Sequence, residues 1–316
     1  SSTYRSSQSC FSVLMSFNEI GARDDNFVNL PDNSIILLGD SFAEGFGVSE
    51  SDTSQYLIEN ELGVPVLNLG SVNFGPLQEL MIYKHYQSLP HEGLIIYVLP
   101  QNDFTDNDVE AWRNNQTRYR PYFSQEGNPL KPYYFPTAVK RDIFIFGNFE
   151  KVKLFIKRYL WSTNALRTFK WLMYNNTIPK VERVDNKIIQ SYFYDANQLQ
   201  QSNLITAYEA ILDLANDKEV LFVIIPFFTD IARWKNEIEQ NSYKQQAWYE
   251  GFMSFQERFQ QRVSILNLMD YLPEDTDELF LKCDAHWNPN GNEWAANTIL
   301  SYIQENRLFT SLLERP

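Results

Sequence analysis

The sequence is poor in cysteine and histidine: its 316 residues contain two cysteines and three histidines. Two cysteines in a chain of this length make neither a disulfide framework nor a metal site. Cys10 and Cys283 could form one bridge between the N-terminus and a segment near the other end of the chain. Two free, partly buried thiols are the simpler interpretation, because an unpaired cysteine behaves as a small apolar residue.

Long hydrophobic runs are also lacking. The longest, at about 220–228, is much shorter than the ~20 apolar residues that a membrane span requires, and its length is typical of a strand. Because the chain starts at Ser1 without a methionine, a signal peptide or a membrane anchor could have been removed from it. We therefore expect an extracytoplasmic protein, either periplasmic or secreted, with or without such an anchor.

Positive charge is the third deficit. The chain has 27 Lys and Arg against 40 Asp and Glu, a net charge of −13, which argues against nucleic-acid binding by the protein as a whole. Residues 140–170 are the exception, since basic residues outnumber acidic ones there, and from Glu150 the pattern is that of an amphipathic helix. This basic segment is either a solvated helix that offsets the acidic body, or a docking site for an anionic polysaccharide, a membrane surface or a partner protein.

Hydrophobic residues make up 44% of the chain and aromatic residues 15%, which excludes a disordered protein and allows a sizeable core. Short apolar runs alternate with helical patterns. The predicted strands are 34–39, 64–69, 94–99, 220–227 and 265–268. The predicted helices are about 53–62, 76–89, 202–216, 235–261 and 292–306. Apolar strands that alternate with helices indicate an α/β fold, in which helices cover both faces of a five-stranded parallel sheet.

We interpret 1–316 as a single domain with an insertion at 104–194, between the third and fourth strands. The insertion is rich in Tyr, Arg and Pro, and it contains a long helical pattern at about 148–174. Insertions at the carboxyl ends of strands surround the ligand crevice of open α/β sheets. The aromatic side chains of this insertion either stack on sugars or form a small satellite core.

The segment Gly39-Asp40-Ser41 follows the first predicted strand directly. This places Ser41 at a strand-to-helix turn on the carboxyl edge of the sheet, where backbone N–H groups point at whatever binds there. A serine at such a turn is either a helix N-cap or a nucleophile. The surrounding sequence is not Gly-x-Ser-x-Gly, which disfavours an α/β-hydrolase with that nucleophile elbow.

One histidine has an acidic neighbour at a useful spacing. Asp284 lies two residues before His286, and residues two apart share a side in an extended segment. The carboxylate could hold Nδ1–H and leave Nε2 to take the proton of a serine hydroxyl. The same pair could be half of a metal site, but no other histidine and no cysteine pair stands ready to complete a tetrahedral zinc site. His85 and His91 have no acidic partner suggested by the sequence.

Two further polar segments follow the second and third predicted strands, and the ends of parallel strands line the same edge as Ser41. The first segment is 68–76, and the second contains Asn102. A backbone N–H from the first segment and the amide of Asn102 can both donate to an oxyanion. The candidate backbone donors are Gly70, Asn73 and Gly75.

Taken in order, Gly-Asp-Ser, Asn-x-Gly, Asn-Asp and Asp-x-His resemble the sequence blocks of the SGNH/GDSL hydrolase family. The resemblance covers about 34–306 apart from the insertion. It implies a flavodoxin-like three-layer α/β/α fold. It also implies that Ser41 is the nucleophile, His286 the base and Asp284 the acid that orients the base. The Ser41 N–H and the Asn102 amide are the implied oxyanion donors, and no cofactor or metal is expected.

The chain departs from the family pattern at three places. Asn73 stands where the family usually has the glycine that supplies the second oxyanion N–H, and the assignment among Gly70, Asn73 and Gly75 stays open. Pro100 replaces a common glycine before the Asn-Asp pair. One residue rather than two separates the aspartate from the histidine, and a tryptophan follows. This last variant resembles the subgroup that adds or removes O-acetyl groups on bacterial surface polysaccharides.

These observations predict a serine esterase or acyltransferase that acts on ester-linked acyl groups through an acyl-serine. The expected substrate is an O-acetylated carbohydrate or cell-surface polysaccharide, and the acceptor is either water or a sugar hydroxyl. Two other classes remain open, a non-catalytic glycan-binding module on the same fold and a flavin or nucleotide binder. Asp40 and Glu44 in the first loop disfavour a bound phosphate.

Overall fold

The structure is a computed structural model. It describes residues 2–24, 31, 33–113, 119–124, 128–135, 191–236, 241–259 and 262–313. The chain divides into two compact units. The first consists of Ser1–Trp112, Pro121–Tyr133 and Ile189–Pro316, and the second of Arg113–Arg120 and Tyr134–Ile188. The second unit lies within the predicted insertion, and in its described part the rings of Tyr119 and Tyr134 stack with their centroids 5.1 Å apart.

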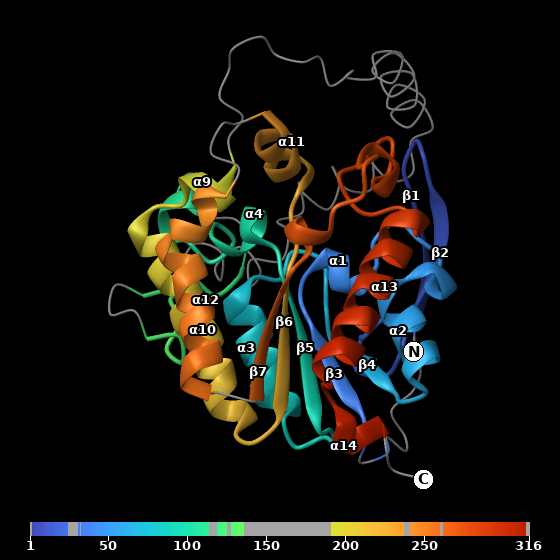
Figure 1. Ribbon diagram of the computed structural model, residues 1–316, viewed down its shortest axis with the longest axis horizontal. Coiled ribbons are helices and arrows are strands. Elements are labelled where there is room, and N and C mark those ends of the chain that lie inside the picture. The colour runs from blue at the N-terminus through green and yellow to red at the C-terminus, as the bar shows by residue number, and fades with distance from the viewer. Residues whose placement is uncertain are drawn as a thin grey trace, which may run out of the picture. The chain divides into compact units, whose positions relative to one another are not determined.

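A five-stranded parallel sheet lies at the centre of the first unit, as far as the structure describes it (Figure 1). Its strands are β3 (Ile35–Leu38), β4 (Val66–Asn68), β5 (Gly93–Val98), β6 (Glu219–Ile224) and β7 (Val263–Asn267). Their order across the sheet is β4-β3-β5-β6-β7, and every neighbouring pair is parallel. This order confirms the predicted flavodoxin-like sheet. The strand order reverses between β3 and β5, which is where open α/β sheets bind ligands, at the carboxyl ends of the strands.

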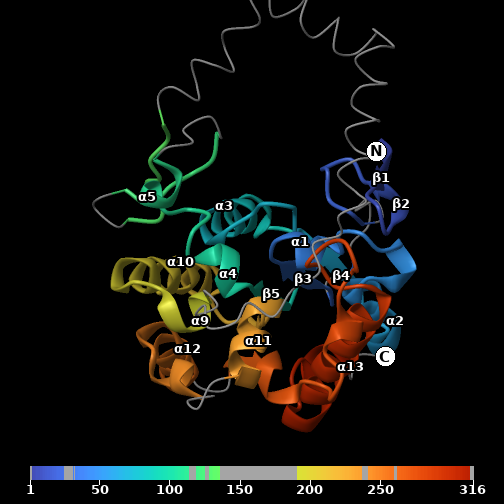
Figure 2. The same ribbon diagram turned by 90° about the horizontal axis from the view of Figure 1, so that it is seen from above.

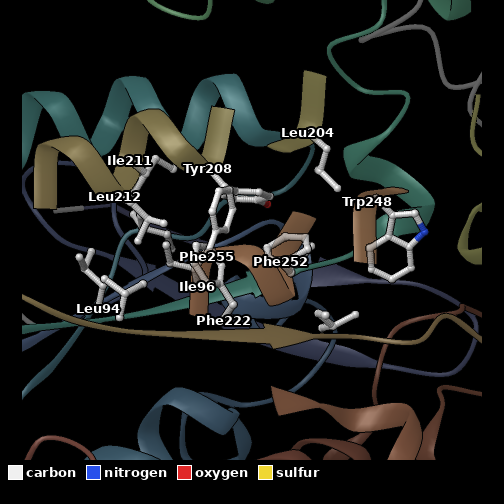
Figure 3. Packing of buried hydrophobic residues seen from close by; sticks show 14 of the residues in the cluster. Leu94, Ile96, Leu204, Tyr208, Ile211, Leu212, Phe222, Trp248, Phe252 and Phe255 are labelled. Carbon is white, nitrogen blue, oxygen red and sulfur yellow. The ribbon is translucent and has the colours of Figure 1, made fainter. Parts of the chain in front are cut away.

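Alternate residues of each strand point to opposite faces of the sheet, so both faces must be covered. Among the described helices, α3 (Pro76–Tyr86), α10 (Gln198–Ala215) and α12 (Ala247–Phe259) cover one face. Beneath them Ile96 and Phe222 of the sheet pack against Tyr208, Phe252 and Phe255 (Figure 3). The rings of Tyr208 and Phe222 lie edge to face with centroids 5.4 Å apart, a favourable arrangement for two aromatic rings.

The other face of the sheet packs against α2 (Ser54–Leu62) and α13 (Pro289–Asn306). Ala295, Ile299 and Ile303 are buried and recur at helical spacing along α13, so one side of this helix faces the strands. Pro289 occupies the first helical position and the Asn288 side chain caps it by accepting from the Gly291 N–H at 3.0 Å. Because these residues fix the first turn of α13, they also fix the position of the preceding segment, which contains Asp284 and His286.

An N-terminal hairpin lies outside the predicted elements and consists of β1 (Ser2–Ser7) and β2 (Ser12–Phe17) paired antiparallel. Its turn carries Cys10, which forms a disulfide with Cys283. The interpretation of two free thiols is therefore wrong. The hairpin brings the Cα of Cys10 within 5.6 Å of that of Cys283, although 273 residues separate the two in sequence.

The single helix predicted at 235–261 is also wrong. The chain forms α11 (Phe228–Asn236), then a 3-10 turn, η2 (Ser242–Gln245), and then α12. The turn buries Tyr243, whose hydroxyl accepts from the Asn267 Nδ2 at 3.1 Å, so a tertiary contact overrides the helical pattern. The predicted helix at 148–174 and the basic segment 140–170 lie outside the described residues.

Shorter elements complete the part of the chain that the structure describes. The short α-helices are α1 (Ser41–Glu44), α4 (Pro100–Asp103), α5 (Val109–Trp112), α9 (Tyr192–Asp195) and α14 (Thr310–Leu313). The other 3-10 turns are η1 (Glu50–Asp52), η4 (Leu268–Tyr271) and η5 (Asp277–Leu279). Figure 2 shows α1, α4 and α11 gathered over the ends of the strands. Among the described helices, none is both long and apolar enough for a membrane span.

Candidate active site

Ser41 lies directly after β3 and begins α1, at the strand-to-helix turn that the sequence predicts. Gly39 makes this turn with a φ of 148°, and a Cβ atom there would lie 2.9 Å from the Cβ atoms of Ala43 and Tyr97, so only glycine fits. The N-cap is Asp40, whose Oδ1 accepts from the Phe42 N–H at 2.9 Å. Because Asp40 takes the capping role, the Ser41 hydroxyl is not used as the cap.

The Ser41 hydroxyl contacts His286 instead. The distance from Ser41 Oγ to His286 Nε2 is 2.7 Å, which is a hydrogen bond. On the other side of the ring, Nδ1 is hydrogen-bonded to Asp284 Oδ1. The same carboxylate oxygen accepts from the backbone N–H of His286 at 3.1 Å. The two halves of the predicted site, 245 residues apart in sequence, thus form one chain of hydrogen bonds.

Packing and backbone contacts hold the histidine loop in place. The Leu281 N–H donates to the His286 carbonyl at 2.8 Å. Trp287, which follows the histidine, is buried, and its ring meets that of Phe42 edge to face with centroids 4.9 Å apart. Phe46, from the loop after α1, lies against the imidazole with centroids 4.7 Å apart. Phe42 lies against the same ring with centroids 5.1 Å apart, so two aromatic residues near the serine pack on His286.

The charge on Asp284 is favoured by its partners. Burial acts to raise the pKa of this carboxyl, but the hydrogen bonds and charge of His286, with a further hydrogen bond from Gln8, outweigh burial and lower the pKa. The Gln8 Nε2 donates to Asp284 Oδ2 at 3.0 Å. Asp284 is consequently an anion at neutral pH, positioned to stabilise a protonated imidazole.

Asn102 lies in α4, after β5, and its side chain turns towards the serine loop. The Nδ2 of Asn102 donates to Asp40 Oδ2 at 3.0 Å, and this uses one of its two hydrogens. The turn is held by the Leu99 N–H, which donates to Asp103 Oδ2 at 2.8 Å. Asn102 and Ser41 are thus linked through Asp40, which neighbours the serine in sequence.

The loop after β4 offers candidate donors whose N–H groups differ in their surroundings. The Gly70 N–H donates to Asn68 Oδ1 at 3.0 Å, and the Gly75 N–H is 3.4 Å from Gln78 Oε1. Asn73 takes a left-handed φ of 64°, a conformation that asparagine tolerates better than most residues. Gly70 is disfavoured as an oxyanion donor, because its N–H already serves an internal side chain.

Several buried carboxyl groups lie behind this edge of the sheet, and no sequence motif marks them as a group. Burial raises the pKa of Asp40 to about 6 and that of Glu44 to about 7. Burial also raises the pKa values of Glu79 and Asp103, each reinforced by the charge of neighbouring carboxyl groups. The sequence does indicate that Glu79 is buried, because it lies between Pro76 and Tyr83 at helical spacing, on the buried side of α3.

The remaining histidines do not join the site. His91 is buried, and its ring nitrogens contact the Tyr83 hydroxyl at 3.1 Å and the Leu89 carbonyl at 2.7 Å, which is a structural role. His85 is exposed on α3. Within the described residues there is no group of His, Cys, Asp and Glu side chains that could hold a metal ion.

Fold and site together define a class: an α/β/α protein in which serine, histidine and aspartate meet at the carboxyl edge of a flavodoxin-like sheet. The four sequence blocks follow β3, β4 and β5 and precede α13, as the resemblance to the SGNH/GDSL hydrolases requires. That resemblance is confirmed at the level of the fold.

No family model and no curated protein matches this sequence. Similar solved structures include a salicylyl-acyltransferase from a tetracycline biosynthetic pathway, 14% identical with a TM-score of 0.42 over 89% of this chain. A lipolytic protein of the G-D-S-L family from Veillonella parvula is 10% identical with a TM-score of 0.42, covering 86% of this chain and 98% of that one. An acetyl xylan esterase from Butyrivibrio proteoclasticus is 11% identical with a TM-score of 0.45 over 90% of this chain.

The match spans 57% of the length of the acyltransferase and 66% of the length of the acetyl xylan esterase. At these identities the comparisons concern the fold, and the named activities belong to those proteins.

Proposed function

We propose that this chain is a serine esterase or O-acyltransferase that works through an acyl-serine intermediate. The observation that carries the proposal is the hydrogen-bonded chain from Ser41 Oγ through His286 to Asp284. A serine hydroxyl is a weak nucleophile until a positioned base takes its proton, and the base works best when a carboxylate fixes its tautomer. The described residues supply all three groups.

In the first half of the reaction, Ser41 Oγ attacks the carbonyl carbon of the ester while its proton passes to His286 Nε2. Asp284 stabilises the imidazolium that forms. The tetrahedral intermediate then breaks its bond to the alcohol, which leaves with the proton from Nε2. The acyl group remains on Ser41 as an ester.

In the second half, an acceptor hydroxyl gives its proton to His286 Nε2 and attacks the acyl carbon. Breaking the acyl–serine bond then returns the proton to Ser41 Oγ. With water as acceptor the reaction is hydrolysis, and with a sugar hydroxyl it is acyl transfer. Both reactions use the same residues, so the site alone allows either.

The negative oxygen of each intermediate requires fixed donors. We assign the Ser41 N–H and the second hydrogen of Asn102 Nδ2 to this role, because the first hydrogen is used by Asp40. A backbone N–H of the loop after β4 is the third candidate. Asn73 is favoured there, since its left-handed φ sets it apart in this loop and the Gly70 N–H faces inwards.

We further propose that the substrate is an ester-linked acyl group of a carbohydrate, with O-acetyl groups of a cell-surface polysaccharide as the first choice. The Asp-x-His-Trp arrangement supports this choice by resemblance. An extracytoplasmic location is part of the same proposal. The disulfide between Cys10 and Cys283 supports it, because structural disulfides persist mainly in oxidising compartments.

The test is hydrolysis of p-nitrophenyl acetate by the full chain, with Ser41→Ala and Ser49→Ala compared. Ser49 is exposed, lies in the loop after α1 and makes no side-chain capping bond, so it is a matched control. We expect Ser41→Ala to lose at least about 10³-fold in kcat and Ser49→Ala to match the wild type. A fluorophosphonate should label Ser41 of the wild type, as mass spectrometry of the tryptic peptide would show. Turnover by Ser41→Ala at the wild-type rate would exclude the acyl-serine mechanism.

The substrate is tested separately, by incubating the wild type with O-acetylated xylan and measuring the acetate released. Adding a non-acetylated oligosaccharide then distinguishes the acceptors, because a transferase would acetylate the sugar and an esterase would release acetate. Tight binding of the polysaccharide without any turnover would instead support a glycan-binding module.

A further inference from the structure

The N-terminal hairpin contacts the candidate active site at several points. Gln8, in the turn between β1 and β2, donates from Nε2 to Asp284 Oδ2 at 3.0 Å. Two residues later, Cys10 is bonded to Cys283, which immediately precedes Asp284. The backbone N–H of each cysteine also donates to the sulfur of the other, at 3.2 Å. The disulfide therefore attaches the hairpin turn covalently to the residue next to Asp284.

The same N-terminal region also holds the loop after the serine. Phe11 lies edge to face with Phe46, with ring centroids 5.4 Å apart, and Phe46 in turn packs on the His286 ring. Arg23 is 2% exposed, and its guanidinium donates to the carbonyl groups of Glu44 at 3.0 Å and Val48 at 2.7 Å. Both loops that carry the Ser–His–Asp chain thus rest on residues from the first 23 positions.

The partners of the Asp284 carboxylate show what Gln8 contributes. Oδ1 is occupied by the ring and the backbone of His286, which approach from one side. Gln8 approaches Oδ2, so the two oxygens are held by groups from opposite ends of the chain. A carboxylate fixed at both oxygens cannot rotate away from Nδ1, and an amide donor also favours its ionised form. The side chain of Asp284 is 19% exposed, so water alone does not fix its orientation.

We propose that Gln8 is a positioning residue for the Ser41–His286–Asp284 site, and that the Cys10–Cys283 disulfide holds it on the carboxylate. The proposal rests on the proposed acyl-serine function. Gln8 acts through Asp284 and does not touch the substrate. The disulfide acts through Gln8, because opening the bridge leaves the hairpin turn without its covalent attachment beside Asp284.

The first experiment compares Gln8→Ala and Gln8→Glu with the wild type in p-nitrophenyl acetate hydrolysis between about pH 4.5 and 9, a range that includes the ordinary pKa of a glutamate. Gln8→Ala should lower kcat about tenfold, the fold-change typical of a lost hydrogen bond to a charged group, with KM little changed. The matched control is Ser9→Ala, because Ser9 is the exposed residue between Gln8 and Cys10. Wild-type kcat in Gln8→Ala would overturn the proposal.

Gln8→Glu gives a readout that a merely structural role would not move. The introduced carboxyl can donate to Asp284 Oδ2 while protonated, but it repels that carboxylate once ionised, and the nearby negative charge raises its pKa. The loss of kcat/KM relative to wild type should therefore grow as pH rises, whereas the loss in Gln8→Ala stays constant. A pH-independent ratio for Gln8→Glu would contradict the positioning role.

The second experiment tests the disulfide with dithiothreitol, which supplies the two electrons and two protons that convert the bridge into two thiols. Both sulfurs belong to exposed residues, so the reagent can reach them. Reduction should lower kcat of the wild type by about the same tenfold as Gln8→Ala. It should lower kcat of Gln8→Ala little further, because two changes on one path are not additive. Equal losses in both proteins would mean that the disulfide does not act through Gln8.

A third measurement separates this proposal from the proposed function. Proton NMR follows the His286 Nδ1–H signal and the titration of the ring in wild type and Gln8→Ala, without any substrate. A signal that shifts or is lost in Gln8→Ala supports positioning, and identical signals and titrations overturn it. Failure of the proposed function has a different signature: the wild type would neither turn over esters nor be labelled by a fluorophosphonate at Ser41.

Discussion

Asp284 is the residue whose charge matters most to the proposed chemistry, because hydrogen bonds favour its ionised form against the effect of burial. Asp284→Asn keeps the size of the side chain but removes the charge that stabilises the imidazolium, and an amide can select the wrong tautomer of His286. We expect kcat for p-nitrophenyl acetate to fall about 10³- to 10⁴-fold, and His286→Ala to be at least as severe. Asp277→Asn, an exposed aspartate seven residues earlier, is the control. If Asp284→Asn keeps most of its activity, another group orients the histidine.

Asn102 allows the oxyanion contribution to be measured apart from nucleophile activation. Its amide donates to Asp40, and we assign its second hydrogen to the negative oxygen of the intermediate. Asn102→Ala should therefore lower kcat about 10²- to 10³-fold and leave KM nearly unchanged, because this interaction strengthens only in the transition state. Steady-state kinetics at saturating ester distinguish the two parameters. A raised KM at constant kcat would assign Asn102 to substrate binding instead.

Among individual residues, the sequence predicts those that stand in a recognisable local motif. Ser41 follows an apolar strand, and Asp284 lies two residues before His286, so their placement needs only the parallel sheet. Gln8 could not be predicted, because 276 residues separate it from Asp284 and nothing near it in sequence indicates a site.

Among the elements, the five strands are predictable because each is a short, mainly apolar run. β3 and β5 are buried along their whole length, as the strands of a sheet covered on both faces are. The hairpin of β1 and β2 is hard to predict because β1 is polar and largely exposed. The apolar residues of β2 form only a short run, in which Met15 alone is buried. The disulfide forms because the hairpin turn carries Cys10 to Cys283, and the presence of two cysteines in the sequence does not predict this contact. At Ser242–Gln245 the sequence has a helical pattern and predicts a continuous helix. The structure has a 3-10 turn there instead, because Tyr243 is buried in the tertiary structure.

The basic segment 140–170 lies outside the described residues, so its role stays a prediction from sequence. We propose that it attracts an anionic polysaccharide, since clustered positive charge on a protein of net charge −13 attracts polyanions at low salt. Changing Lys153, Lys157 and Arg158 together to Glu should slow deacetylation of an anionic O-acetylated polysaccharide severalfold and leave p-nitrophenyl acetate hydrolysis unchanged. The difference should shrink as salt is added. If the wild type and the triple variant deacetylate the polymer at equal rates at low ionic strength, the segment does not bind the polysaccharide.

For the molecule as a whole, the buried carboxyl groups couple the fold to pH. Burial raises the pKa of Asp40 to about 6 and those of Glu44 and Asp230 to about 7, and Glu79 and Asp103 are raised well above their usual values. Sequence patterns locate a buried glutamate such as Glu79 but not its acidic neighbours, because these come from different strands and helices. The electrostatics of the interior therefore emerges only when the chain is folded.

A group whose pKa is higher in the folded state contributes stability below its unfolded pKa and loses that contribution as pH rises through the folded pKa. For Glu79 the loss begins near its ordinary pKa of 4.5 and continues upwards. The free energy of unfolding of the wild type should therefore fall between about pH 5 and 7, where Asp40, Glu44 and Asp230 act in the same direction.

Glu79→Gln tests this coupling, because an amide of the same shape does not titrate. Its stability relative to the wild type should increase with pH, and the loss of the single Glu79 proton accounts for up to about 1.4 kcal/mol per pH unit. Removing the Glu79 charge also relieves the repulsion that raises the pKa of Asp103, and this adds to the same trend. Urea unfolding followed by circular dichroism at pH 5, 6, 7 and 8 measures the difference, with the exposed Glu278→Gln as control. Parallel pH curves for wild type and Glu79→Gln would show that this carboxyl titrates as it does in the unfolded chain.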